Sequence, residues 1–149
     1  MGIRRAGWND RAWYGPLEEV AWYANNAGDK QFDATNVFEN DKKNYGNRLV
    51  ANGNRPRPVG QKAANGFKLY DMLGNVWEWT ADWFKDRYES DGVAVDPQGP
   101  PKREARVLRG GAWNGRAADV RESYRISHRP GGLGSSGIGF RCVGDISVR

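Results

Sequence analysis

The chain has 149 residues, of which 38% are hydrophobic, and a formal net charge of +5. Its single cysteine, Cys142, excludes an internal disulfide framework and a cysteine-cluster zinc site. Lys and Arg are interleaved with Asp and Glu without a long basic run, which argues against nucleic acid as a partner.

We expect one domain over residues 1–149, because this length fits a single core and no linker composition interrupts it. No apolar run is long enough to cross a bilayer, and the first residues lack the pattern of a signal peptide. The sequence therefore predicts no membrane partner. The expected location is the cytoplasm, or the surface of a virion or cell on which a partner displays the chain.

The first expected element is a helix that begins near Pro16 and ends near Gly28. Proline is favoured in the first helical turn and glycine just beyond the last one. Apolar residues recur between them at helical spacing: Leu17, Val20, Ala21 and Ala24. The next segment, residues 29–58, is rich in Asn, Asp, Lys and Gly and is expected to be surface loop.

A short strand is expected at residues 75–80, after a Gly-Asn turn. Alternation places Trp77 and Trp79 on one face of this strand and Glu78 on the other. A carboxylate among large apolar groups is costly to bury alone, so Glu78 needs an arginine or a metal ion as its partner.

Two further strands are expected, at residues 107–113 and 138–143. The first contains Gly110 and Gly111, a pattern typical of a bulge or of close backbone approach. The chain has seven tryptophans, which favour a core built from large aromatic side chains. One helix, short strands and long loops together indicate an α+β domain with much irregular structure.

Several motifs, in order, resemble the formylglycine-generating enzyme family, whose sulfatase-modifying domain is a variant of the C-type lectin fold. They are residues 17–23, 59–61, 66–79, 82–83, 96–97, 106–113 and 138–141. The resemblance implies a C-type lectin-like α+β fold with short strands, long irregular loops and one or two helices. It also implies that Cys142 has a structural role.

The oxidising enzymes of that family carry two active-site cysteines shortly after the Arg-Gly-Gly-aromatic element. With these cysteines they bind copper and oxidise a substrate cysteine to formylglycine. The resemblance puts the two positions at Gly115 and Val120, neither of which supplies a thiolate. We therefore expect the fold without the oxidase chemistry, and a chain that is not an enzyme.

The same signature also resembles the variable proteins of diversity-generating retroelements, in which adenine-directed mutagenesis rewrites Asn codons of a binding surface. Such rewriting cannot produce Lys, Glu, Gln, Met or Trp. Between Asn114 and Gly137 only Glu122 belongs to these types. We interpret residues 107–143 as a variable ligand-binding segment whose partner is a protein or another macromolecule. The alternatives are a divergent sulfatase-modifying oxidase and an inactive accessory relative of it.

The polar segment and the tryptophan before it supply the candidate ligand-binding residues. They are Trp113, Asn114, Gly115, Arg116, Asp119, Glu122, Ile126, Ser127, His128, Arg129, Gly131, Leu133, Ser135 and Ser136. His128 is expected to be an exposed contact, because no nucleophile and orienting acid can be assigned to it.

The arginines of this segment have two interpretations, an anion-binding face or structural ion pairs. We favour ion pairs with scaffold carboxylates for Arg121 and Arg125, and surface exposure for Arg116 and Arg129.

The resemblance also implies a calcium site, the one cofactor we consider. Its ligands would be the side chains of Asn75 and Glu78 and the backbone carbonyl of Val76. The alternative is a salt bridge from Glu78 to Arg109 or Arg141. The sequence leaves this choice open.

Overall fold

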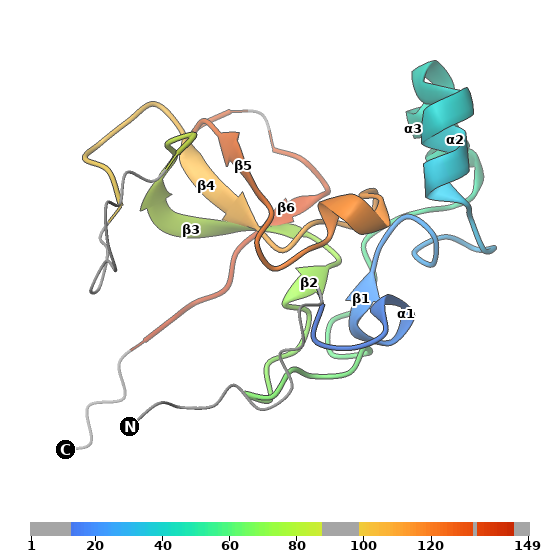
Figure 1. The fold of residues 1–149 in the computed structure, drawn as a ribbon, viewed down its shortest axis with the longest axis horizontal. Coiled ribbons are helices and arrows are strands. Elements are labelled where there is room, and N and C mark those ends of the chain that lie inside the picture. The colour runs from blue at the N-terminus through green and yellow to red at the C-terminus, as the bar shows by residue number, and fades with distance from the viewer. Residues whose placement is uncertain (1–12, 88–98, 133, 145–149) are drawn as a thin grey trace.

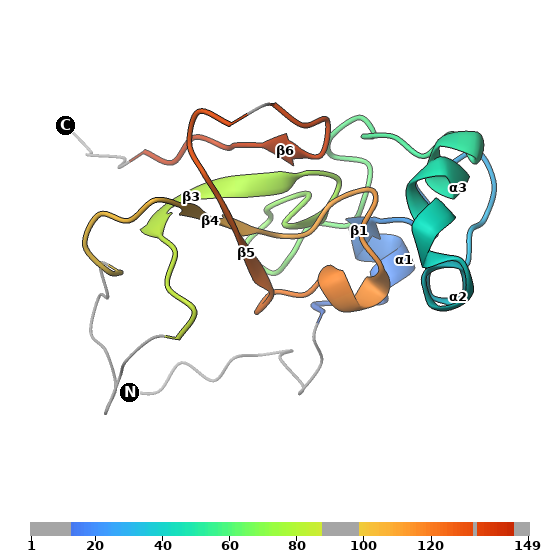
Figure 2. The same ribbon diagram turned by 90° about the horizontal axis from the view of Figure 1, so that it is seen from above.

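The computed structural model describes residues 13–87, 99–132 and 134–144. A four-stranded sheet lies at one end and a pair of short helices at the other, with loops and a two-stranded sheet between them (Figure 1, Figure 2). The elements are α1 (Leu17–Val20), β1 (Ala21–Trp22), α2 (Ala34–Asn40), η1 (Lys42–Asn44), α3 (Tyr45–Ala51), β2 (Leu73–Gly74), β3 (Trp77–Trp83), β4 (Arg106–Arg109), η2 (Ala117–Asp119), β5 (Arg125–His128) and β6 (Ile138–Gly139). Among the described residues, no helix has the length and apolar character to cross a membrane.

The larger sheet has the strand order β5-β4-β3-β6. Strand β4 pairs antiparallel with both β3 and β5, whereas β6 pairs parallel with β3. The register sets Trp79 opposite Leu108, and Leu108 opposite Ile126. Both Val107 and Leu108 are fully buried, so β4 is covered on both faces and anchors the sheet.

The helix expected at Pro16–Gly28 is wrong beyond its first turn. It ends at Val20, and Ala21 and Trp22 are extended and pair in parallel with Leu73 and Gly74. The side chain of Asn26 accepts from the Tyr23 amide at 2.9 Å and donates to the Ala21 carbonyl at 3.0 Å. These local side-chain bonds compete with the helical ladder, so the chain turns although its apolar spacing is helical.

The surface loop expected at residues 29–58 contains two helices. Asp33 caps α2, because its carboxylate accepts from the Asn36 amide at 3.0 Å. The two helices bury little: Ala34 and Leu49 are their buried residues. Such a narrow apolar stripe leaves most positions polar, which explains why the composition resembled a loop.

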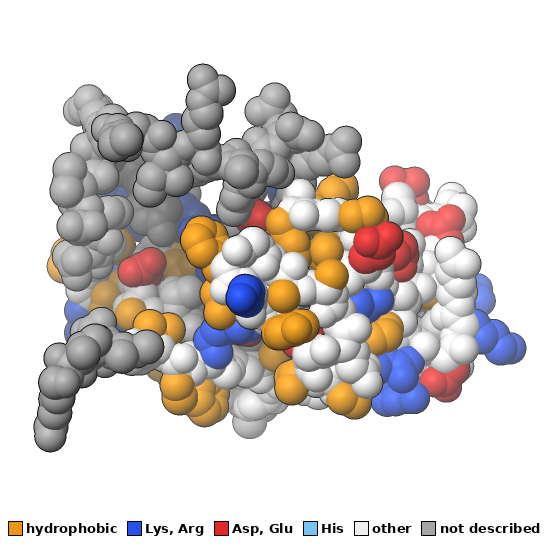
Figure 3. Space-filling view, turned by 90° about the horizontal axis from the view of Figure 1, so that it is seen from below, with side chains coloured by type: hydrophobic (Ala, Val, Ile, Leu, Met, Phe, Trp, Pro, Cys, Tyr) orange, Lys and Arg blue, Asp and Glu red, His pale blue; other side chains and the backbone are white. Residues whose placement is uncertain are grey.

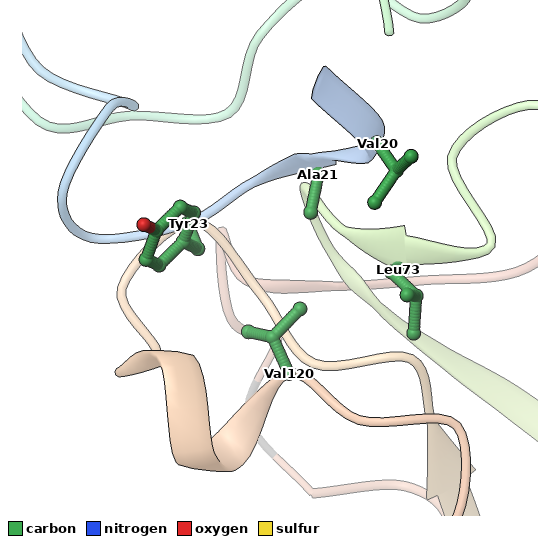
Figure 4. Close-up of a cluster of buried hydrophobic side chains, with 5 residues drawn as sticks. All are labelled: Val20, Ala21, Tyr23, Leu73 and Val120. Carbon is green, nitrogen blue, oxygen red and sulfur yellow. The ribbon is translucent and has the colours of Figure 1, made fainter. Parts of the chain in front are cut away.

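The expected aromatic core is also wrong. The buried hydrophobic residues of the described chain are mostly small aliphatic side chains, with Tyr23 as the one aromatic among them. Figure 4 shows the larger cluster, in which three stretches of the chain meet through Val20, Ala21, Tyr23, Leu73 and Val120. The described tryptophans are only partly buried. Cationic groups stack on two of these rings, Lys62 on Trp22 at 3.9 Å and Arg106 on Trp83 at 3.7 Å.

Candidate functional site

The Gly110-Gly111 pair ends β4 and turns the chain back onto the core. Both glycines have positive φ, at 92° and 82°. A Cβ at Gly111 would lie 2.8 Å from Val120 Cγ2 and 3.0 Å from Val120 Cα. The expected close backbone approach is therefore observed, and it fixes where the polar segment starts.

Gly115 and Val120 face each other directly after this turn. Val120 is fully buried, and a Cβ at Gly115 would lie 3.3 Å from Val120 Cγ2. The Gly115 amide donates to the Ala112 carbonyl at 2.8 Å, and its carbonyl accepts from the Ala24 amide at 2.9 Å. The space beside Gly115 is thus filled by the Ala112 carbonyl, the Val120 side chain and Asp119 Cβ, and backbone hydrogen bonds close it.

This proximity predicts that Gly115→Cys combined with Val120→Cys forms a disulfide, because the two side chains would start within bonding reach. After mild oxidation, thiol titration of the unfolded double variant should detect only Cys142. Each single variant should show its new thiol in addition to Cys142. A double variant that keeps all its thiols free would mean that the two positions do not face each other.

A pocket of about 520 Å³ opens beside β3, β4 and the end of β5. It is lined by Trp79, Thr80, Arg106, His128, Pro130, Gly131, Gly132, Gly134, Ser135 and Ile138. Three of these, His128, Gly131 and Ser135, are predicted ligand-binding residues. His128 is half-buried rather than exposed, because its ring packs edge-on against Trp79 with centroids 5.4 Å apart.

The beginning of the polar segment lies elsewhere, against the two helices. The Tyr45 hydroxyl donates to the Asn114 carbonyl at 3.0 Å. Arg116 pairs with Asp119 at 2.9 Å and stacks on Phe38 at 3.9 Å. Arg116 was expected to be exposed, but this pair and this ring hold it half-buried. The hydrogen bonds that Arg116 donates to the Asp119 carboxylate raise the pKa of the Arg116 guanidinium, which stays charged.

Trp113 connects the two ends of the polar segment. Its indole nitrogen donates to the Ser136 carbonyl at 3.3 Å, and its ring packs on the cluster of Ala24, Ala34 and Leu49. Gly137 is buried, and a Cβ there would lie 3.6 Å from the Trp113 indole nitrogen and 3.7 Å from Ser135 Oγ. The first and last residues of the segment therefore lie side by side.

The remaining predicted contacts do not join the pocket. Ser127 and Arg129 are exposed, and alternation along β5 directs Ser127 to the face opposite His128. Arg129 pairs with Glu104 at 2.6 Å. Glu122 lines a separate pocket of about 390 Å³ together with Tyr14 and Phe67. Leu133, Asp96 and Pro97 lie outside the described residues.

Comparison with known proteins now identifies the family. Residues 6–146 match the model described as the sulfatase-modifying factor enzyme 1-like domain. The chain belongs to this family. Its structure is similar to that of Treponema denticola variable protein 1, with a TM-score of 0.66 and 31% identity over 90% of this chain and 41% of that one. This similarity confirms the α+β fold that the sequence predicted.

Two relatives show how widely this domain is used. The formylglycine-generating enzyme of Streptomyces coelicolor is 41% identical over 61% of this chain and 30% of that protein. The serine/threonine-protein kinase Pkn1 of Chlamydia trachomatis is 48% identical over 52% of this chain and 13% of that protein. The chain therefore spans less than a third of either relative.

In this member of the sulfatase-modifying factor enzyme 1-like family, Glu78 has a protein partner. The Nε of Arg141 donates to one Glu78 carboxylate oxygen at 2.7 Å, and a terminal nitrogen of Arg141 donates to the other. Arg109 instead donates to the carbonyls of Glu122 and Ser123, both at 3.3 Å. Of the two arginines that the sequence offered, the partner is therefore Arg141.

The residues assigned to calcium do not fit that ion in this arrangement. Arg141 occupies both carboxylate oxygens of Glu78. The Asn75 amide bonds the backbone of Arg57, accepting from its N–H at 2.9 Å and donating to its carbonyl at 3.0 Å. No described group of three or more His, Cys, Asp or Glu side chains has the arrangement of a metal site.

Arg121 and Arg125, for which ion pairs with scaffold carboxylates were predicted, donate hydrogen bonds to backbone carbonyls. Arg121 donates to the Ala118 carbonyl at 2.7 Å, and Arg125 donates to the carbonyls of Lys85 and Asp86. Arg125 also stacks on Phe84 at 5.0 Å. Both arginines thus hold loops in place, a structural role achieved with carbonyl oxygens.

Sequence reasoning missed the scaffold half of the pocket, formed by Trp79, Thr80 and Arg106. The Thr80 hydroxyl donates to the Val107 carbonyl at 3.2 Å, which ties β3 to β4 beneath the pocket. Alternation in β3 predicts that Trp79 shares a face with Trp77, but it does not reveal which residues of other strands lie beside Trp79. Only the pairing of Arg106 with His128 brings that arginine to the pocket.

Proposed function

We propose that this chain is a non-catalytic ligand-binding protein, a variable protein of a diversity-generating retroelement. The observation that carries the proposal is that residues 114–137 combine a few buried positions with many accessible ones. Among the described residues of that stretch, only Val120 and Gly137 are buried, and both pack against the framework. Exposed members such as Ser127, Arg129 and Ser136 can be exchanged at little cost to the fold, whereas Arg121 and Arg125 hold loops in place.

The proposed partner is a protein or another macromolecule. The polar segment contributes His128, Gly131 and Ser135 to the pocket, and Ser127 and Arg129 extend the exposed surface beyond it. The similarity to a Treponema denticola variable protein supports this use of the fold. Binding would depend on side chains presented by a rigid sheet, because β4 is buried on both faces.

The DNA beside the gene tests this proposal. We expect a near-copy of the stretch encoding residues 107–143, which differs mainly where the copy has adenine, together with a reverse transcriptase gene. A complete flanking sequence that holds neither would contradict the diversification proposal.

The competing function is a divergent sulfatase-modifying oxidase, favoured by 41% identity to a formylglycine-generating enzyme. The apolar contact between Gly115 and Val120 argues against it, since it offers copper no thiolate. Incubation of the protein with Cu(I) and a cysteine-containing sulfatase peptide should produce no aldehyde. Aldehyde formation above the protein-free background would instead assign the oxidase function.

A further inference from the structure

The pocket beside β5 has two chemically different halves. His128, Gly131 and Ser135 come from the polar segment, whereas Trp79, Thr80 and Arg106 come from strands outside it. If residues 114–137 vary, as proposed above, the strand half stays constant. A constant half would give every variant the same chemical preference at this point.

Arg106 carries the only formal charge among the described residues that line the pocket. The central carbon of its guanidinium lies over Trp83, 3.7 Å from the ring centroid, and one guanidinium nitrogen donates to the Ala81 carbonyl. Its other N–H groups have no acceptor among the described residues. An arginine held in one orientation with N–H groups to spare is suited to a two-point bond with a carboxylate.

The described charges closest to Arg106 along the chain favour an anion. Glu104, the nearest acidic residue along the chain, is paired with Arg129 at 2.6 Å. Lys102 and Arg103 are exposed just before β4 and add positive potential. The same pocket has an apolar wall, formed by Trp79 and Ile138, next to the cation.

We propose that Arg106 and Trp79 form a fixed subsite for a carboxylate attached to a flat apolar group, such as an acidic side chain beside an aromatic one in a protein ligand. The carboxylate accepts from Arg106, and the apolar group packs against Trp79. This subsite rests on the proposed binding function, and it confines diversification to the other half of the pocket. Specificity would then come from the variable residues, while the scaffold supplies a shared anchor.

The test uses phenylacetate as the probe and phenylacetamide as its neutral match. Both are titrated into the full chain while the Trp79 indole N–H is followed by NMR. We expect saturable shifts with phenylacetate and binding of phenylacetamide weaker by about tenfold, the loss of one charge-assisted contact. Equal affinity for the two probes, or no shift at Trp79, would overturn the proposal.

Two variants sharpen the test. R106Q should bind phenylacetate about tenfold more weakly, whereas R48Q should bind it like the wild type, because Arg48 lies on α3, pairs with Asp41 and does not line the pocket. Unchanged binding by R106Q would refute the subsite. If R106Q fails to fold, the comparison of carboxylate and amide on the wild type decides alone.

Glucuronate is an acidic sugar without a flat apolar group. Its binding distinguishes an acidic sugar from a protein as the source of the carboxylate. Saturable binding of glucuronate but not phenylacetate would overturn the assignment to a protein ligand. The flanking-DNA test is independent of all these outcomes, so failure of the subsite and failure of the proposed function are distinguishable.

Discussion

Gly74→Ala is expected to lower the free energy of unfolding by more than about 4 kcal/mol, the range of severe backbone and packing defects. A Cβ at this position would lie 2.2 Å from the Trp22 carbonyl oxygen and 2.9 Å from the Trp22 amide nitrogen. These are backbone atoms, and the same carbonyl accepts from the Asn75 amide at 2.7 Å. The pairing of β1 with β2 would have to open. Urea denaturation followed by tryptophan fluorescence measures the effect.

Gly60→Ala is the matched control. Gly60 has the same φ of 75° as Gly74, but a Cβ there would meet nothing within 4 Å. Gly60→Ala should lower the free energy of unfolding only by the strain of the left-handed conformation, about 1 kcal/mol. Equal losses in the two variants would show that close approach to Trp22 is not what requires glycine at position 74.

Arg141→Gln is expected to destabilise the fold by about 3 kcal/mol, because it leaves Glu78 without its partner. Arg141 donates to both Glu78 oxygens and also to the carbonyls of Tyr70 and Asp71, each at 3.1 Å. The bond to Glu78 raises the pKa of Arg141, so the guanidinium stays charged. One side chain thus joins β3, the loop before β2 and the C-terminal segment. Thermal and urea unfolding would measure the loss.

Arg129→Gln provides the comparison for this pair. Arg129 and Glu104 also form an arginine–carboxylate pair, but their side chains are 75% and 81% exposed, against 34% and 19% for Arg141 and Glu78. Solvent screening should reduce its effect to less than about 1 kcal/mol. A loss as large as that of Arg141→Gln would mean that burial does not distinguish the two pairs.

The described residues also expose an apolar loop between α3 and β2. The exposed large side chains of the segment between α3 and β2 include Val59, Phe67, Leu69 and Tyr70. In the view from below, hydrophobic side chains gather near the middle of the molecule (Figure 3). This surface is distinct from the pocket at β5.

Local sequence patterns predicted the strands better than the helices. Alternation of Trp77, Glu78 and Trp79 requires only an extended backbone, and the structure has β3 there. The spacing of Leu17 to Ala24 fits a helix equally well, yet Asn26 bonds the backbone and the chain turns. Propensity gave the wrong answer where a side chain competed with the helical ladder.

The site was only half predictable for a related reason. Composition singled out His128 and Gly131, because restricted residue types mark the polar segment. Arg106 lies in the pocket only because β4 pairs with β5 in one register, and a single sequence does not reveal this non-local pairing. The same register turns Ser127 away from His128, so a contiguous stretch does not form one patch.

Sequencing this gene from many cells of its natural population tests the central claim most directly. If residues 114–137 form a diversified surface on a fixed framework, substitutions should concentrate at exposed positions such as Ser127, Arg129 and Ser136. Val120 and Gly137 should stay constant, as should Arg106 outside the segment. Substitutions spread evenly along the chain, or an invariant polar segment, would contradict it.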